Sequence, residues 1–181
     1  MELTPQGAFA RVVIFGGPFR DLPLGMASSP SGALYVTGFF QGRASMDPAH
    51  PVDEEGQCPP EQPYCHVAAE GSEDQWRGDA FLVRLDASSS GIVYNWSRPW
   101  GSDGFEDAGV SVALDMEGNP AVAGYFCGGG GCDLCTVDFD PSPTRADARV
   151  GRGLRDAAVT QFDSSGRHLG VYTAGGVGSD E

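Results

Sequence analysis

The chain has 181 residues, with 25 acidic and 11 basic side chains that give a formal net charge of −14. So acidic a surface repels a phosphate backbone, which argues against nucleic-acid binding. No apolar run reaches the roughly 18 residues that a membrane-spanning helix needs. Short alternating apolar segments, separated by turns rich in glycine, predict a single all-β domain.

The predicted strands are short, and polar turns join many of them in pairs. The turns "SPSG", "DMEGN", "DASSSG" and "DSSG" place glycine where a positive φ is wanted. In chain order, the predicted strands cover residues 12–17, 22–28, 33–40, 80–86, 92–97, 109–115, 120–126, 157–163 and 169–174.

A unit of roughly 80 residues recurs along the chain. Residues 19–40 align without gaps with 105–126, and "GDAFLVRLDASS" aligns with "RDAAVTQFDSSG". The N-terminal 2–21 aligns with 161–180. Residues of the first segment with identical partners in the second are Phe19, Asp21, Ala27, Gly32, Val36, Gly38 and Phe40.

Each unit is predicted to hold four antiparallel strands, the arrangement of a β-propeller blade. We therefore expect a partial β-propeller of about two blades plus one extra N-terminal strand, within a longer protein. Residues 1–21 would end a preceding blade and 176–181 would begin the next. The two full blades are expected at 22–100, with a long insert at 41–78, and at 101–175, with an insert at 127–155.

The recurring phrases resemble a known family. "GDAFLVRLDASSSGIVYNWSRPWGSDGFEDAGVSVALDMEGNPAVAGYF" and "TVDFDPSP" are similar to the SBBP repeat, the seven-bladed β-propeller repeat of bacterial surface and secreted proteins. The resemblance implies the propeller fold and an extracellular or cell-surface location. It implies no active site, because the family is defined by its repeat. The two inserts and their cysteines depart from the pattern.

All five cysteines lie in the two inserts, and in an exported protein they predict disulfides that close these loops. Cys58 and Cys65 are natural partners within the first insert. Cys127, Cys132 and Cys135 leave one thiol over, unless it pairs across the inserts. The competing interpretation is a zinc site built from 127–135 and one acidic or histidine ligand.

Two aspartates of the second insert are candidate metal ligands. Asp138 and Asp140 alternate along an extended segment, so their carboxylates could begin a calcium site. The favoured interpretation is a polar turn that ends at Pro141. No other cofactor is expected.

The remaining polar candidates favour structural roles. Asp21 and Asp107 occupy the same position in the repeat and are expected to bind backbone amides at a blade junction. His168 is expected to be a surface or edge residue. His66 could serve a Ser-His-acid arrangement, but no nucleophile motif surrounds any serine.

The sequence therefore predicts a non-catalytic scaffold that binds a protein or glycan and packs against further blades of the same protein. The alternatives are a hydrolase-like propeller enzyme, with active residues on other blades, and a calcium-stabilised repeat. Alternating strand directions place both inserts on one face of the disc and the short turns on the other. Function concentrates in long loops on rigid scaffolds, so Tyr64 and Trp76 are the expected aromatic anchors of the insert face.

Overall fold

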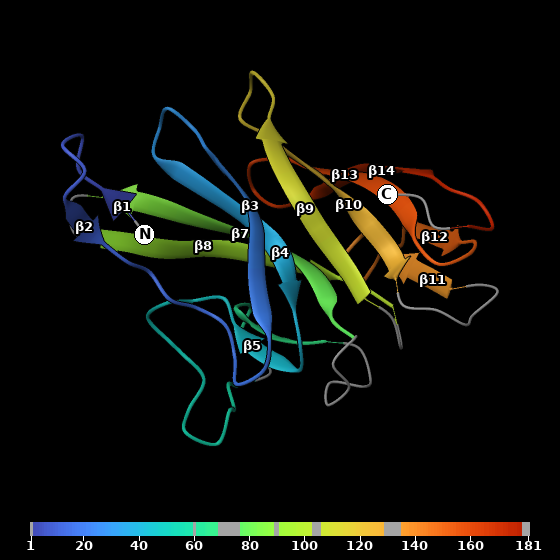
Figure 1. Ribbon diagram of the computed structural model, residues 1–181, viewed down its shortest axis with the longest axis horizontal. Coiled ribbons are helices and arrows are strands. Elements are labelled where there is room, and N and C mark those ends of the chain that lie inside the picture. The colour runs from blue at the N-terminus through green and yellow to red at the C-terminus, as the bar shows by residue number, and fades with distance from the viewer. Residues whose placement is uncertain are drawn as a thin grey trace.

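The computed structural model is all-β and describes residues 2–59, 61–68, 77–88, 91–102, 106–128 and 135–178. Two four-stranded antiparallel sheets dominate it (Figure 1). In both sheets the spatial order of the strands follows the chain, which confirms the predicted all-β, blade-like arrangement. The first sheet comprises β3 (Asp21–Ser28), β4 (Ala33–Phe40), β7 (Asp79–Ser88) and β8 (Gly91–Trp100). The second comprises β9 (Glu106–Leu114), β10 (Pro120–Gly128), β13 (Asp156–Phe162) and β14 (His168–Ala174).

Three two-stranded sheets accompany the blades. Two of them lie in the inserts. The sequence predicted no strand there, because strands of three or four residues are too short to show a clear alternation. The pairs are β1 (Glu2–Leu3) with β2 (Phe9–Arg11), β5 (Arg43–Ser45) with β6 (Cys65–Val67), and β11 (Cys135–Asp138) with β12 (Ala148–Gly151).

The extra N-terminal strand is present, but its predicted position was wrong. It covers Phe9–Arg11 rather than 12–17, and it pairs with β1 instead of standing alone. Its described ladder pairs Leu3 with Phe9 and Glu2 with Arg11. The segment 12–17 contributes a single bridge, in which Gly16 and Ser45 exchange backbone hydrogen bonds.

One turn recurs in the hairpins and explains part of the repeat. Its first residue is Ser, Thr or Asp, its fourth is a glycine with positive φ, and the N–H of its fifth donates to the side-chain oxygen of the first. The glycine N–H donates to the first residue's carbonyl oxygen. Among the described residues this turn begins at Thr4, Ser29, Asp53, Asp115 and Asp163.

The two large sheets pack against each other, with β9 lying along β3 and β4 (Figure 1). The side chains buried between them form a continuous cluster, which we call the interblade core. Its large members are Tyr35, Leu82, Trp96, Trp100, Phe126, Val137, Phe139 and Phe162. A second buried cluster, the first-insert core, covers the other face of the first sheet. It contains Phe40, Ala44, Met46, Ala68, Phe81, Val83 and Leu85.

Candidate functional site

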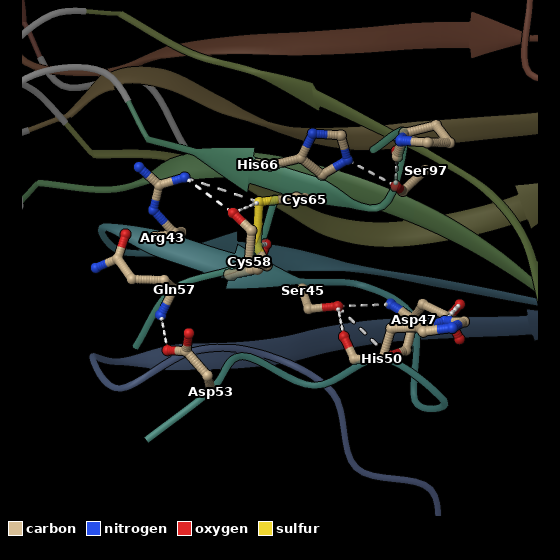
Figure 2. The surroundings of a disulfide bond; sticks show 12 residues. Arg43, Ser45, Asp47, His50, Asp53, Gln57, Cys58, Cys65, His66 and Ser97 are labelled. Atoms are coloured by element: carbon tan, nitrogen blue, oxygen red, sulfur yellow. Dashed lines mark hydrogen bonds and ion pairs between the residues drawn. A yellow bond between two sulfur atoms is a disulfide. The ribbon is translucent and has the colours of Figure 1, made fainter. Parts of the chain in front are cut away.

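The first insert contains the hairpin of β5 and β6, and a disulfide closes part of the loop that joins these strands (Figure 2). Cys58 and Cys65 form the predicted disulfide, with their Cα atoms 5.8 Å apart. Ala44, in β5, and Met46, just after β5, are buried in the first-insert core. The insert is thus part of the hydrophobic packing of its blade.

The second insert also contains a hairpin and a disulfide, but here the disulfide joins the end of β10 to the start of β11. Cys127 and Cys135 form a disulfide with a Cα–Cα distance of 5.9 Å, while Cys132 lies outside the described residues. Because these two sulfurs are bonded to each other, they do not provide the thiolates that the competing zinc site would need. Val137 and Phe139 of this insert are fully buried in the interblade core.

Asp138 and Asp140 organise the tip of the second insert. The Asp138 Oδ1 accepts hydrogen bonds from the N–H groups of Asp140 (3.0 Å) and Asp147 (2.8 Å). The Asp140 Oδ1 accepts from the N–H of Ser142 (3.0 Å), and its Oδ2 lies 3.2 Å from Arg145 Nη2. These are the bonds of the favoured polar turn. Within the described part of the chain, no group of three or more His, Cys, Asp or Glu side chains could hold a metal ion. The calcium site remains a prediction.

A cleft of about 680 Å³ opens where the first insert, strand β8, the tip of the second insert and the β13–β14 turn meet. Its lining combines residues from both blades and both inserts. Its lining includes the polar side chains of His66, Ser97, Arg98, Arg145, Ser165 and Arg167.

The wall formed by the first insert contains a serine–histidine pair (Figure 2). The Nε2 of His66 lies 2.6 Å from Ser97 Oγ, which also lies 3.0 Å from the hydroxyl of Tyr94. Burial lowers the pKa of His66 to about 4, and the nearby charge of Arg98 lowers it too. His66 is therefore neutral at pH 7. No carboxylate among the described residues hydrogen-bonds its ring, so the pair lacks the acid that completes a triad.

Arg98 joins the two blades at the floor of the cleft. Its Nε donates to the carbonyl oxygen of Gly166 (2.7 Å), and its Nη1 donates to that of Ser97 (2.6 Å). The guanidinium also lies 5.4 Å from the ring centroid of Trp96. The β13–β14 turn is held against β8 by this side chain.

Tyr64, one of the two expected aromatic anchors, does not line the cleft. Tyr64 is half-buried: its ring stacks on His50 with centroids 5.2 Å apart and contacts Tyr94 edge-on. Trp76 lies outside the described residues. The neighbouring Pro63, rather than Tyr64, lines the cleft. Sequence alone could not show this, because the ring packs on side chains of another strand.

Two further expectations need correction. His168 lies on the edge strand β14, which agrees with the expected edge position, but it is not a surface residue: it is 6% exposed, contacts Phe162 edge-on, and its Nε2 lies 3.2 Å from Thr160 Oγ1. The separation of the insert face from the face of short turns is also incomplete. The tip of the second insert and the β13–β14 turn border the same cleft, because the insert packs on the interblade core.

The two repeat-related aspartates act as predicted. Asp107 is fully buried, and its carboxylate accepts hydrogen bonds from the N–H groups of Ser102 (2.7 Å) and Cys127 (2.8 Å). Asp21 accepts a hydrogen bond from the N–H of Gly17 (2.7 Å). Each carboxylate thus ties the link before a blade to its first strand.

A scan against protein-family models and a search of curated proteins find no match to this chain. In the described part of the structure, no helix is long and apolar enough to cross a membrane. The fold and the cleft between its blades therefore carry the functional argument.

Proposed function

We propose that the chain is a segment of an extracellular or cell-surface β-propeller of the SBBP-repeat type, and that it is a non-catalytic scaffold that binds a protein or glycan. The repeated sheets, their shared turns and the resemblance of the repeat phrases support the family. Two disulfides in so short a chain support an oxidising location. Further blades of the same protein would pack on its free faces.

The observation that carries the binding role is the cleft between the two inserts. Each insert contains one disulfide and contributes buried side chains to a hydrophobic core. A recess bounded by such fixed loops is pre-organised, so ligand binding costs little ordering entropy. We therefore place the proposed binding site in the cleft. This is a smaller surface than the whole insert face that the sequence predicted.

A hydrolase is the second candidate, because Ser97 and His66 are within hydrogen-bonding distance in the cleft wall. Ser97 is only 1% exposed, however, and it also contacts Tyr94 and the Pro63 carbonyl oxygen. These contacts make the serine part of a packed network rather than a presented nucleophile. Hydrolysis of a p-nitrophenyl ester that is lost in Ser97→Ala, with unchanged melting temperature, would favour the enzyme.

Trimming the inserts is a poor test of binding, because they contribute to both cores and their loss would unfold the blades. A blocking substitution is sharper. Ser165 is exposed at the cleft, in the third position of the recurring turn, so Ser165→Trp should occlude the recess. Ser31 is exposed at the equivalent position of the β3–β4 turn and does not line the cleft. Ser31→Trp is the matched control.

The wild type and both variants would be screened on peptide and glycan arrays. We expect some ligands to bind the wild type and Ser31→Trp but not Ser165→Trp, with all three proteins giving the same circular dichroism spectrum. Equal binding by the two variants would contradict the assignment of the cleft as the binding face.

A further inference from the structure

We propose that the cleft accepts an extended acidic peptide segment, whose side-chain carboxylates contact Arg98, Arg145 and Arg167. This inference rests on the proposed binding role of the cleft and names the class of its ligand. It concerns an interaction with a partner polypeptide that presents glutamate or aspartate residues.

The charged side chains of the cleft lining favour an anionic ligand. The chain carries 25 acidic and 11 basic residues, yet the described lining of this recess includes three arginines and one carboxylate, that of Asp140. Arg145 pairs with Asp140, and Arg167 pairs with Asp163 at the edge of the turn. Because Arg145 and Arg167 are ion-paired, the excess positive charge of the recess comes from Arg98, and such a charge attracts anionic ligands.

The burial and the hydrogen bonds of Arg98 also favour an anionic ligand. Arg98 is half-buried, and its described hydrogen bonds go to backbone carbonyl oxygens rather than to a carboxylate. An arginine has five N–H donors and keeps its charge in proteins, so Arg98 has donors to spare beyond these two bonds. A partly desolvated arginine with no described hydrogen bond to a carboxylate favours an incoming anion, and arginine binds carboxylates in a bidentate manner.

Arg145 and Arg167 can add to this attraction. Each arginine forms its ion pair through one side-chain nitrogen, Nη2 in Arg145 and Nε in Arg167. Their side chains are 49% and 61% exposed, so the remaining donors can reach a ligand. The three arginines come from β8, the second insert and the β13–β14 turn. A chain of several residues is needed to contact all of them.

The rest of the lining favours a peptide over an acidic glycan. Apart from two histidines, the described residues of the lining include no aromatic side chain on which the apolar face of a sugar could lie. It instead includes four prolines, which provide rigid apolar surface between the arginines. Arginine is also among the residues that contribute most to protein–protein binding. The prolines are Pro63, Pro99, Pro141 and Pro143.

The test uses the full chain and fluorescein-labelled hexaglutamate, with labelled hexaglutamine as the neutral probe and oligogalacturonate as the acidic glycan probe. We expect hexaglutamate to bind and the other two probes not to bind. The affinity for hexaglutamate should fall as ionic strength rises. The double variant Arg145→Gln/Arg167→Gln should bind about tenfold more weakly or worse, because charge-assisted hydrogen bonds are lost. Ser165→Trp should abolish binding.

Arg11→Gln is the matched control, because Arg11 is partly exposed and paired with a carboxylate, that of Glu2, in the N-terminal hairpin. It should bind hexaglutamate like the wild type. The proposal is overturned if hexaglutamine binds equally well, if only oligogalacturonate binds, or if the double variant matches Arg11→Gln. It is also overturned if no probe binds. A persisting contrast between Ser165→Trp and Ser31→Trp on the arrays would then leave the binding role intact and reject only the ligand class.

Discussion

Gly118 and Gly166 occupy the same position of the recurring turn, and both have a φ of +83°. Their surroundings differ. A Cβ on Gly118 would meet no atom within 4 Å, whereas one on Gly166 would lie 2.8 Å from the indole of Trp96. The first glycine serves only the backbone, and the second also permits close contact between the blades.

This difference gives a first prediction. Gly118→Ala should lower the free energy of unfolding by about 1 kcal/mol, the cost of a positive φ in alanine. Gly166→Ala should pay that cost and a further ~1–3 kcal/mol for crowding against Trp96. Urea denaturation monitored by circular dichroism measures both. Equal losses would show that the turn does not pack on Trp96 in solution.

Gly38 and Gly124 show how the repeat keeps a glycine for steric reasons. Each lies on the second strand of its blade, opposite an irregularity in the pairing with the first strand. A Cβ there would collide with the carbonyl oxygen of Leu22 or Ala108, respectively. This explains why the two residues match in the aligned segments.

Asp107 couples folding to pH. Burial raises its pKa from 3.8 to about 7, although its hydrogen bonds to backbone N–H groups act in the opposite direction. Between these pH values the folded protein holds a proton that the unfolded chain has released. The free energy of unfolding contributed by this group therefore falls as pH rises through that window.

The second prediction uses Asp107→Asn, which cannot ionise. The melting temperature of the wild type, relative to that of the variant, should fall as pH rises from about 4 to about 7. The lowered pKa of His66 has the opposite effect, because its stabilising contribution is lost as pH falls below 6.5. It is present in both proteins, so it cancels in the difference. A difference in melting temperature that stays constant across this range would contradict the raised pKa of Asp107.

At the scale of elements, each insert is a hairpin that covers one face of its own blade. The first-insert core joins β5 and its flanks to the first sheet. The second insert places Val137 and Phe139 among residues of both sheets. The inserts are therefore structural elements of the repeat as well as borders of the cleft.

The third prediction tests this role. Phe139 is fully buried and contacts Phe126 edge-on, so Phe139→Ala should cost about 3–5 kcal/mol of unfolding free energy. Leu169→Ala, at a position that is 46% exposed on β14, should change it by only about 0.5 kcal/mol. Chemical denaturation distinguishes the two. A small effect at Phe139 would mean that the second insert is detached from the core.

At the scale of the whole molecule, the repeat identifies a face that is built to be covered. Leu82 of the first blade is fully buried, and it pairs across β7 and β8 with Arg98, which contacts the second blade. The equivalent cross-strand pair of the second blade is Val159 and Tyr172, which are 43% and 77% exposed. The second blade thus leaves open the face that the first blade buries.

The fourth prediction is that this open face causes the chain to self-associate, since exposed apolar patches favour association. Tyr172→Glu should reduce the association measured by light scattering at rising concentration, because it places a charge in the patch. Met116→Glu is the control, for Met116 is fully exposed on a turn outside this face. If the wild type stays monomeric at high concentration, the face does not drive association.

Local sequence determined the blades. The alternation of apolar residues and the glycine turns predict four strands per unit, because strand and turn formation depend on neighbours a few residues away. The Cys58–Cys65 bond was predictable for the same reason, since the two residues are 7 positions apart. The equivalence of Asp21 and Asp107 followed from the repeat.

Only the tertiary structure decided the site. The cleft depends on contacts such as His66 with Ser97, 31 positions apart, and Arg98 with Gly166, 68 positions apart. The burial of His168 and the packing of the inserts likewise depend on which blade faces which. The pattern of a single strand records that one of its faces is apolar, but it does not record which distant segment covers that face, because burial of apolar surface is non-directional.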